Sequence, residues 1–207
     1  FFIMSKNRTF IHVLLALLAV AILVVPVVGG GGTQGGSAQP VVIGHRGSAY
    51  AVENTPTAMR HALDAGAQLL EVDVYLSADC VPVLCHDSNL SRLAGLDVDI
   101  SDTYFAELSS IQLSQNSQIS RLITLEQAIE YVDGRARLLI ELKQQGEAGM
   151  ALADRVMQAT AQYTGAGDFL YMSQDYETAM YMMNKYPQAN VGFCLYGDSA
   201  ACVDDLC

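Results

Sequence analysis

Positive charge is scarce in this chain of 207 residues. It has 11 Lys and Arg against 22 Asp and Glu, which gives a formal net charge of −11. Binding to nucleic acid depends on Lys and Arg side chains that neutralise phosphates, so this composition argues against a nucleic-acid partner. A small phosphorylated ligand stays possible, because a bound divalent cation can supply the positive charge that the side chains lack.

Cysteine is also sparse, and no internal repeat is present. The five cysteines fit neither the ligand spacing of a zinc site nor a dense disulfide framework. Outside the cytoplasm, two of the last three could form a bridge, and free or buried thiols are the alternative. These last three are Cys194, Cys202 and Cys207.

Acidic residues are missing from the first 52 positions, where one long apolar run stands out. Residues 10–28 are apolar apart from His12, and a helix of this length just spans a hydrocarbon core of about 30 Å. We predict a transmembrane helix here. A secretory signal peptide that starts at Met4 is the alternative, because "SKNR" would serve as its charged segment.

The flanks of this run predict where the rest of the chain lies. Lys6 and Arg8 precede it, so the positive-inside rule makes residues 1–9 a cytoplasmic segment. With either interpretation the remainder is expected outside the cytoplasm, and the transmembrane helix would keep it at the cell membrane. Residues 29–40, "GGGGTQGGSAQP", have no apolar face and predict a flexible linker, so the folded domain is expected over residues 41–207.

From Pro40 onward, short aliphatic runs alternate with helical patterns, which is typical of parallel βα units. A stretch at about 88–123 fits no simple βα connection and predicts an insertion over one end of the fold. A complete (β/α)8 barrel needs eight strands, and only six strand-like runs are present. We therefore expect an α/β TIM barrel present as an incomplete fragment of about six βα units. An open doubly wound sheet is the alternative. The six runs are residues 41–44, 67–76, 81–86, 137–143, 168–172 and 190–196.

Polar residues at the ends of these apolar runs are the informative ones. In "EVDV", Glu71 and Asp73 are two apart and share one face of a strand, and "IELK" places Glu141 and Lys143 in the same way. His45 with Arg46 follows the first run, and His86 with Asp87 follows the third. The carboxyl ends of barrel strands form one face, which holds the active site, so these residues are expected to meet there.

The chemistry of this set suits cleavage of a phosphodiester. Three carboxylates are hard ligands for Ca²⁺ or Mg²⁺, and two imidazoles can exchange protons near neutral pH. Each residue also has an ordinary structural explanation: Glu141 and Lys143 form an ion pair, and a lone histidine is usually structural. The same pattern on four of six strands makes independent explanations of that kind unattractive.

The motifs are similar to those of the glycerophosphodiester phosphodiesterase family. They are "HRG" (45–47), "ENTPTAMRHALDAGA" (53–67), "LLEVDVYLSADCVPVLCHD" (69–87) and "LLIELK" (138–143), and the similarity runs from about residue 41 to 196. The resemblance implies a TIM barrel with an insertion after the third strand. It also implies metal-dependent hydrolysis of glycerophosphodiesters to glycerol 3-phosphate and an alcohol, and a membrane span ahead of the domain resembles the membrane-anchored branch of the family.

Carried over by position, the resemblance assigns a role to each matching residue. Two alternatives stay open: a phospholipase-type lyase that acts on membrane lipids, and a noncatalytic lipid- or wall-binding domain on the same fold. The implied roles are acid–base catalysis for His45 and His86, binding of a divalent metal, Ca²⁺ or Mg²⁺, for Glu71, Asp73 and Glu141, phosphate binding for Arg46 and Lys143, and support of the site for Glu53 and Asn54.

Overall fold

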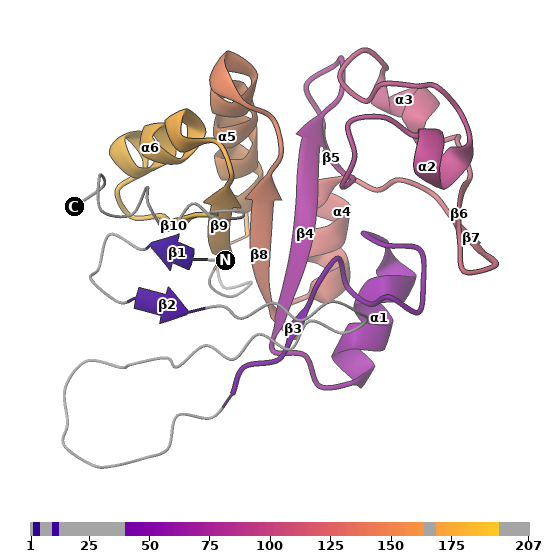
Figure 1. The fold of residues 1–207 in the computed structure, drawn as a ribbon, viewed down its shortest axis with the longest axis horizontal. Coiled ribbons are helices and arrows are strands. Elements are labelled where there is room, and N and C mark those ends of the chain that lie inside the picture. Colours follow the sequence, from indigo (N-terminus) through magenta and orange to yellow (C-terminus); the bar gives the residue numbers. More distant parts are fainter. Residues whose placement is uncertain (1, 5–9, 13–39, 164–168, 195–207) are drawn as a thin grey trace.

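A six-stranded sheet with helices packed against it forms the body of the protein (Figure 1). The computed structural model describes residues 2–4, 10–12, 40–163 and 169–194. The six strands of the sheet are β3 (Ile43–Gly44), β4 (Leu69–Leu76), β5 (Pro82–Leu84), β8 (Arg137–Leu142), β9 (Phe169–Ser173) and β10 (Asn190–Phe193).

Five of these strands run parallel in the order of the sequence. The spatial order is β3–β4–β8–β9–β10, and each neighbouring pair is parallel. A doubly wound sheet reverses its order at the middle, whereas a barrel continues strand by strand around its axis. The observed order is that of a barrel.

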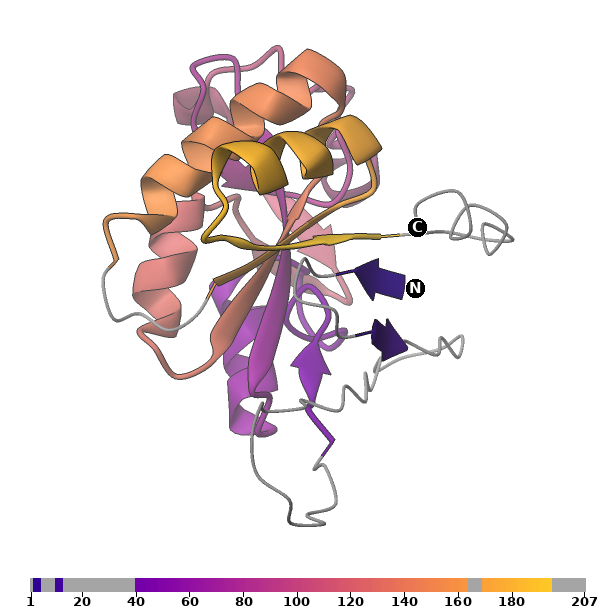
Figure 2. The same cartoon turned by 90° about the vertical axis from the view of Figure 1, so that its left-hand side faces the viewer.

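The helices follow the strands and carry local sequence signals for their ends. Thr55 caps α1 (Pro56–Asp64), and Pro56 occupies its first position. A capping box of Thr124 and Gln127 opens α4 (Leu125–Val132). The turned view shows α5 (Gly146–Thr160) and α6 (Tyr176–Lys185) side by side over the sheet (Figure 2).

The prediction that residues 81–86 form a parallel strand is wrong. β5 pairs with β4 in the antiparallel sense, with Val74 opposite Leu84 and Leu76 opposite Pro82. The reason is the length of the connection, because the few residues between β4 and β5 suffice for a turn, whereas a parallel crossover needs a dozen or more. The described part of the main sheet thus holds five parallel strands and one antiparallel strand, and the expected count of six βα units is too high.

The predicted insertion folds as a small layer with its own apolar core. It contains α2 (Ser91–Ala94), α3 (Phe105–Leu108) and an antiparallel pair, β6 (Leu113–Gln115) with β7 (Gln118–Ser120). Asn116 and Ser117 join the pair with φ of 51° and 60°, as a two-residue hairpin turn requires. The buried core of the insertion is Leu90, Leu93, Ile100, Leu108, Leu113 and Leu122, packed on Val52, Val83 and Cys85.

The expected transmembrane helix lies mostly outside the described residues. Its first three residues form strand β2 (Phe10–His12), which pairs with β1 (Phe2–Met4), and residues 13–28 and the linker at 29–39 are not described. Among the helices that the structure describes, none has the length and apolar character needed to cross a bilayer.

The described cysteines are free thiols that differ in exposure. Cys80 is exposed, whereas Cys85 and Cys194 are buried; Cys202 and Cys207 lie outside the described residues. Burial raises the pKa of the Cys85 thiol to about 12, so at pH 8 its reactive thiolate is much scarcer than that of an ordinary cysteine.

We therefore expect iodoacetamide at pH 8 to alkylate Cys80 in the folded protein and to leave Cys85 unmodified. Tandem mass spectrometry of the peptide that holds both residues measures the difference, and denaturation in urea should make the two equally reactive. Equal alkylation rates in the native state would contradict the burial of Cys85.

Candidate active site

Three buried carboxylates gather where β4 and β8 lie side by side. In the register of the two strands, Asp73 is paired with Glu141, and Glu71 is two residues earlier on the same face of β4. Oxygen atoms of the three residues lie within 4.8 Å of one another. Burial, and then the charge of Asp73, raises the pKa of Glu71 well above its ordinary value, and burial also raises the pKa of Glu141.

Two oxygens of this cluster lack a hydrogen bond within the described part of the chain, although one of them, Asp73 Oδ1, forms an ion pair with Lys143 Nζ at 3.4 Å. Glu71 Oε1 and Asp73 Oδ1 are buried without a hydrogen-bond partner among the residues that the structure describes. Buried polar atoms are otherwise nearly always satisfied, so these two mark a place for a ligand. A set of carboxylate oxygens is the donor set that Ca²⁺ and Mg²⁺ prefer, and the cluster therefore fits a divalent cation.

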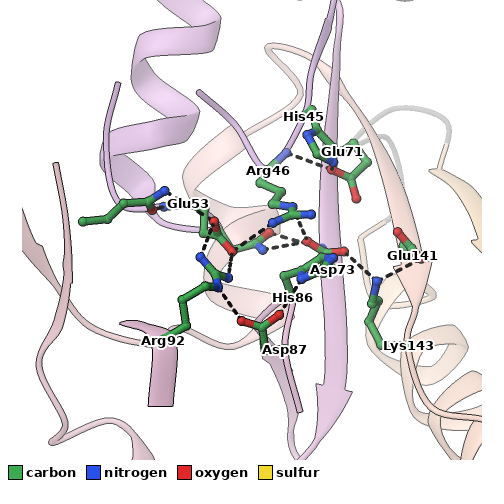
Figure 3. Close-up of polar contacts among 12 residues, drawn as sticks. His45, Arg46, Glu53, Glu71, Asp73, His86, Asp87, Arg92, Glu141 and Lys143 are labelled. Atoms are coloured by element: carbon green, nitrogen blue, oxygen red, sulfur yellow. Dashed lines mark hydrogen bonds and ion pairs between the residues drawn. The ribbon is translucent and has the colours of Figure 1, made fainter. Parts of the chain in front are cut away.

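Two cationic side chains flank the carboxylates (Figure 3). Lys143 Nζ lies 3.1 Å from Glu141 Oε1 and 3.4 Å from Asp73 Oδ1, and Arg46 Nε lies 3.4 Å from Asp73 Oδ2. Burial lowers the pKa of Lys143, but the charges of Asp73 and Glu141 outweigh burial and hold that pKa above its ordinary value. The ammonium and the guanidinium are thus fixed at the edge of the acidic cluster.

A tight turn after β3 presents His45 and Arg46 to the cluster. A Cβ at Gly44 would lie 2.6 Å from the carbonyl oxygen of Gly47, and one at Gly47, whose φ is +84°, would lie 2.8 Å from the backbone nitrogen of Met59. Only glycine fits such close approaches. Arg46 itself adopts a φ of 53°, and its backbone N–H donates to Glu71 Oε2 at 2.8 Å. Strain of this kind is typical of functional sites.

The loop before α1 supports the site from the other side. The Asn54 side chain donates to Asp73 Oδ2 at 2.9 Å and accepts from the Asp73 backbone N–H at 3.2 Å. Glu53 Oε1 accepts from Arg46 Nη1 at 3.2 Å. Both residues are buried, and they orient one carboxylate and one cation of the site.

The two histidines reach the site by different routes. β3 and β4 pair in parallel up to Gly44 and Leu70, so the next residue, His45, lies beside Glu71, with Nε2 3.9 Å from Oε2. His86 arrives through the antiparallel strand β5, and its Nδ1 lies 2.7 Å from Asp87 Oδ1. Partial burial, followed by the charge of Arg46, lowers the pKa of His45.

All nine predicted site residues therefore lie at one end of the sheet, and four further polar residues join them. Asp87 and Arg92 pair with each other, the Gln115 side chain accepts from the Glu53 backbone N–H, and Gln174 donates to Glu141 Oε1 at 2.6 Å. Gln174 directly follows β9, so its place at a strand end was a usable signal. Arg92 and Gln115 belong to the insertion, where no periodic pattern indicated that they face the site.

Comparison with a family model identifies the protein family of this chain. The model of the glycerophosphoryl diester phosphodiesterase family matches residues 45–204, which is most of the chain. This chain is a member of that family. The family prediction is thereby confirmed, and the motifs from "HRG" to "IELK" lie within the matched range.

Solved structures of the glycerophosphodiester phosphodiesterase fold agree with this assignment. A phosphodiesterase from Oleispira antarctica, solved in complex with the product sn-glycerol 3-phosphate, superposes with a TM-score of 0.72 and 28% identity over 81% of this chain and 70% of its own. A glycerophosphodiester phosphodiesterase from Thermotoga maritima gives a TM-score of 0.66 and 29% identity over 81% and 67%. The TIM-barrel-like α/β fold is thus confirmed.

Curated relatives match over shorter stretches. Human lysophospholipase D is 43% identical over 67 residues, which are 32% of this chain and 21% of that protein. A putative glycerophosphodiester phosphodiesterase of Bacillus subtilis is 28% identical over 151 residues, or 70% of this chain and 62% of that protein. This chain thus spans about a fifth of the human relative and less than two thirds of the bacterial one.

Proposed function

We propose that this protein hydrolyses glycerophosphodiesters to glycerol 3-phosphate and an alcohol. The observation that carries the proposal is the set of three buried carboxylates, two of them with an unsatisfied oxygen, beside two cations and two histidines. Family membership supports it, and so does the product that the Oleispira antarctica relative holds.

Glu71, Asp73 and Glu141 would hold a divalent cation, for which we propose Ca²⁺ or Mg²⁺. When bound, such an ion offsets negative charge on the phosphoryl oxygens. The chain supplies the rest of that charge, since Arg46 and Lys143 are held within 3.4 Å of Asp73, where they can donate to phosphate oxygens.

The two histidines would carry the protons. One removes a proton from the attacking hydroxyl, which is that of water or of the substrate itself, and the other donates a proton to the leaving alcohol oxygen. Asp87 accepts from Nδ1 of His86, which leaves Nε2 of that ring as the atom that exchanges a proton with the substrate.

Release of glycerol 3-phosphate from glycerophosphocholine by the full chain tests the proposal. We expect turnover with Ca²⁺ or Mg²⁺, loss of turnover with a chelator, and recovery when the metal is restored. The same protein should leave a phosphomonoester such as glycerol 2-phosphate intact. A metal-loaded, folded protein that cleaves none of a panel of glycerophosphodiesters would refute it.

A second candidate substrate is a phosphodiester that carries an acyl chain. Tyr50 and Ile119 are each 69% exposed, and the Gln118 side chain donates to the Tyr50 carbonyl, so both apolar residues lie on adjoining segments. Tyr50 also shares a loop with Glu53, beside the site. This apolar edge favours a lysophospholipid or another membrane lipid, and the name of the human relative points the same way.

We expect a Tyr50→Ser/Ile119→Ser double variant to lower kcat/KM for lysophosphatidylcholine about tenfold and to change kcat/KM for glycerophosphocholine less than twofold. Loss of contact with an acyl chain explains the difference, because each buried CH₂ contributes about 0.8 kcal/mol. Equal effects on the two substrates would show that the edge does not contact the chain. A cyclic phosphate that accumulates as the final product, without being opened by water, would identify the lyase reaction.

We further propose that residues 10–28 anchor the catalytic domain to the cell membrane, outside the cytoplasm. The apolar composition of this run and the preceding Lys6 and Arg8 support the proposal. In intact cells, an externally added protease should then degrade the domain, while a cytoplasmic marker protein survives. Protection of the domain until the cells are lysed would contradict the predicted location.

A further inference from the structure

One guanidinium of the insertion joins two separate parts of the site. Arg92, on α2, donates from Nε to Asp87 Oδ2 at 2.6 Å. The same side chain donates from Nη2 to Glu53 Oε1 at 2.6 Å and from Nη1 to Glu53 Oε2 at 3.1 Å. Figure 3 shows Arg92 between the two acids. Three charge-assisted bonds from one planar group fix both carboxylates in orientation.

Each of these acids holds one of the residues to which we assign chemistry. Asp87 uses its other oxygen, Oδ1, to contact His86 Nδ1 at 2.7 Å. Glu53 contacts Arg46 Nη1 at 3.2 Å. Two paths of direct contact therefore run from Arg92, one through Asp87 to a proton carrier and the other through Glu53 to a phosphate-binding cation.

We propose that Arg92 is a positioning residue, which sets the orientation of His86 through Asp87 and of Arg46 through Glu53. The inference rests on the proposed function, since it concerns how the side chains of that same site are oriented. It also assigns a purpose to the insertion, which carries Arg92 and, on β6, Gln115, whose side chain accepts from the Glu53 backbone N–H at 2.9 Å.

The burial of Glu53 makes this connection stronger than an ordinary surface ion pair. Burial raises the pKa of Glu53, but the hydrogen bond from Arg92, and then the charge of Arg46, holds that pKa below its ordinary value. Without Arg92, the buried Glu53 carboxylate would have Arg46 as its remaining cationic hydrogen-bond partner, besides the neutral Gln115 amide at 3.5 Å. The Arg46 guanidinium would then turn toward Glu53 and away from the phosphate, while Asp87 would be free to rotate and release His86.

Two effects should follow from Arg92→Ala, measured on the full chain with glycerophosphocholine and saturating Mg²⁺. We expect kcat to fall about thirtyfold, because His86 is less well oriented, and KM to rise several-fold, because Arg46 is drawn away. Arg92→Lys should give values of kcat and KM between those of Arg92→Ala and the wild type, because one ammonium cannot bridge both acids. Arg121→Ala, an exposed position of the same insertion, is the matched control and should change neither constant more than twofold.

Non-additivity separates positioning from a general structural effect. Asp87→Asn should reproduce the decrease in kcat and leave KM nearly unchanged. The Arg92→Ala/Asp87→Asn double variant should then have the kcat of Asp87→Asn alone, because both changes break the same path to His86. Multiplicative losses in kcat, or a kcat of Arg92→Ala equal to that of the wild type, would overturn the proposal.

A spectroscopic measurement keeps this test independent of the substrate. The ¹⁵N shifts of the His86 imidazole report which ring nitrogen carries the proton, and we expect a firmly Nδ1-protonated ring in the wild type and in Arg121→Ala. Arg92→Ala should shift the ring toward a mixture of tautomers. An unchanged spectrum would refute the positioning role even if the enzyme is active, whereas a shifted spectrum in a protein that cleaves no phosphodiester would refute only the proposed function.

Discussion

Replacement of His45 or His86 by glutamine is expected to lower kcat for glycerophosphodiester cleavage about a thousandfold. General acid–base catalysis contributes about 10² to 10⁴ to a rate, and glutamine keeps a polar side chain of similar reach without the ability to exchange a proton near neutral pH. Steady-state release of glycerol 3-phosphate measures the loss. KM should change little, since Arg46, Lys143 and the carboxylates stay in place.

The stability of these variants should be close to that of the wild type. The side chain of His45 is 54% exposed and that of His86 is 29% exposed, so neither supports the core. Thermal unfolding checks this expectation. The matched control is His61→Gln, a partly exposed histidine of α1 on a helix rather than at a strand end, which should keep full activity. A histidine variant that keeps more than a tenth of the wild-type kcat would remove that residue from the acid–base pair.

The alternation of side chains along a strand and the parallel direction of the strands explain why most of the site could be predicted from the sequence. Glu71 and Asp73 share a face because strand side chains alternate, and Glu141 joins them because parallel neighbours end at the same edge. His45 follows from the same rule. Glu53 and Asn54 lie in a loop, where no period applies, and only the family resemblance indicated them.

The antiparallel strand β5 shows where this logic was incomplete. His86 does reach the site, although not at the carboxyl end of a parallel strand. β4 continues past Asp73, and the short turn returns the chain, so that the Cys85 backbone N–H donates to the Asp73 carbonyl oxygen at 3.0 Å. The connection between Leu76 and Pro82 has only five residues, which is too few for a parallel crossover, so its length could have predicted the antiparallel pairing.

Contacts across long sequence separations are what the sequence did not indicate. Arg92 is 39 positions from Glu53, and Gln115 is 62 positions from it. Both lie in short elements, α2 and β6. The orientation of these elements depends on how the apolar core of the insertion packs on Val52 and Val83. Such packing depends on many residues at once and leaves no short motif.

Exchange of Glu71 for glutamine should remove most of the activity and abolish the stabilisation of the protein by a divalent cation. Glu71 supplies one of the three carboxylates and one of the two unsatisfied oxygens of the cluster. We expect kcat/KM to fall at least a hundredfold. In the wild type, Ca²⁺ or Mg²⁺ at 100 times its Kd should add about 2.7 kcal/mol to the free energy of unfolding, or about 5 to 10 °C in Tm for a domain of this size.

The same variant should be more stable than the wild type when no metal is present. Carboxylate oxygens within 4.8 Å repel one another in a buried site, and burial and the charge of Asp73 raise the pKa of Glu71. Glutamine removes this group, whose ionisation is unfavourable there, while its amide oxygen can still accept from the Arg46 backbone N–H. A metal-free Tm above that of the wild type, with no rise on addition of metal, is therefore the expected pair of results. Glu107→Gln, an exposed position of α3, is the matched control and should keep the wild-type response.

The Tm without metal and the change in Tm on addition of metal together distinguish a metal site from a structural cluster of acids. If the carboxylates served only as partners of Arg46 and Lys143, loss of Glu71 would leave Asp73 and Glu141 to pair with them, and the wild type would not respond to the cation. A Glu71→Gln protein that is less stable without metal, or that still gains Tm with it, would contradict the assignment of Glu71 as a ligand. A cluster that lowers stability until a cation binds is expected of a site kept for its chemistry.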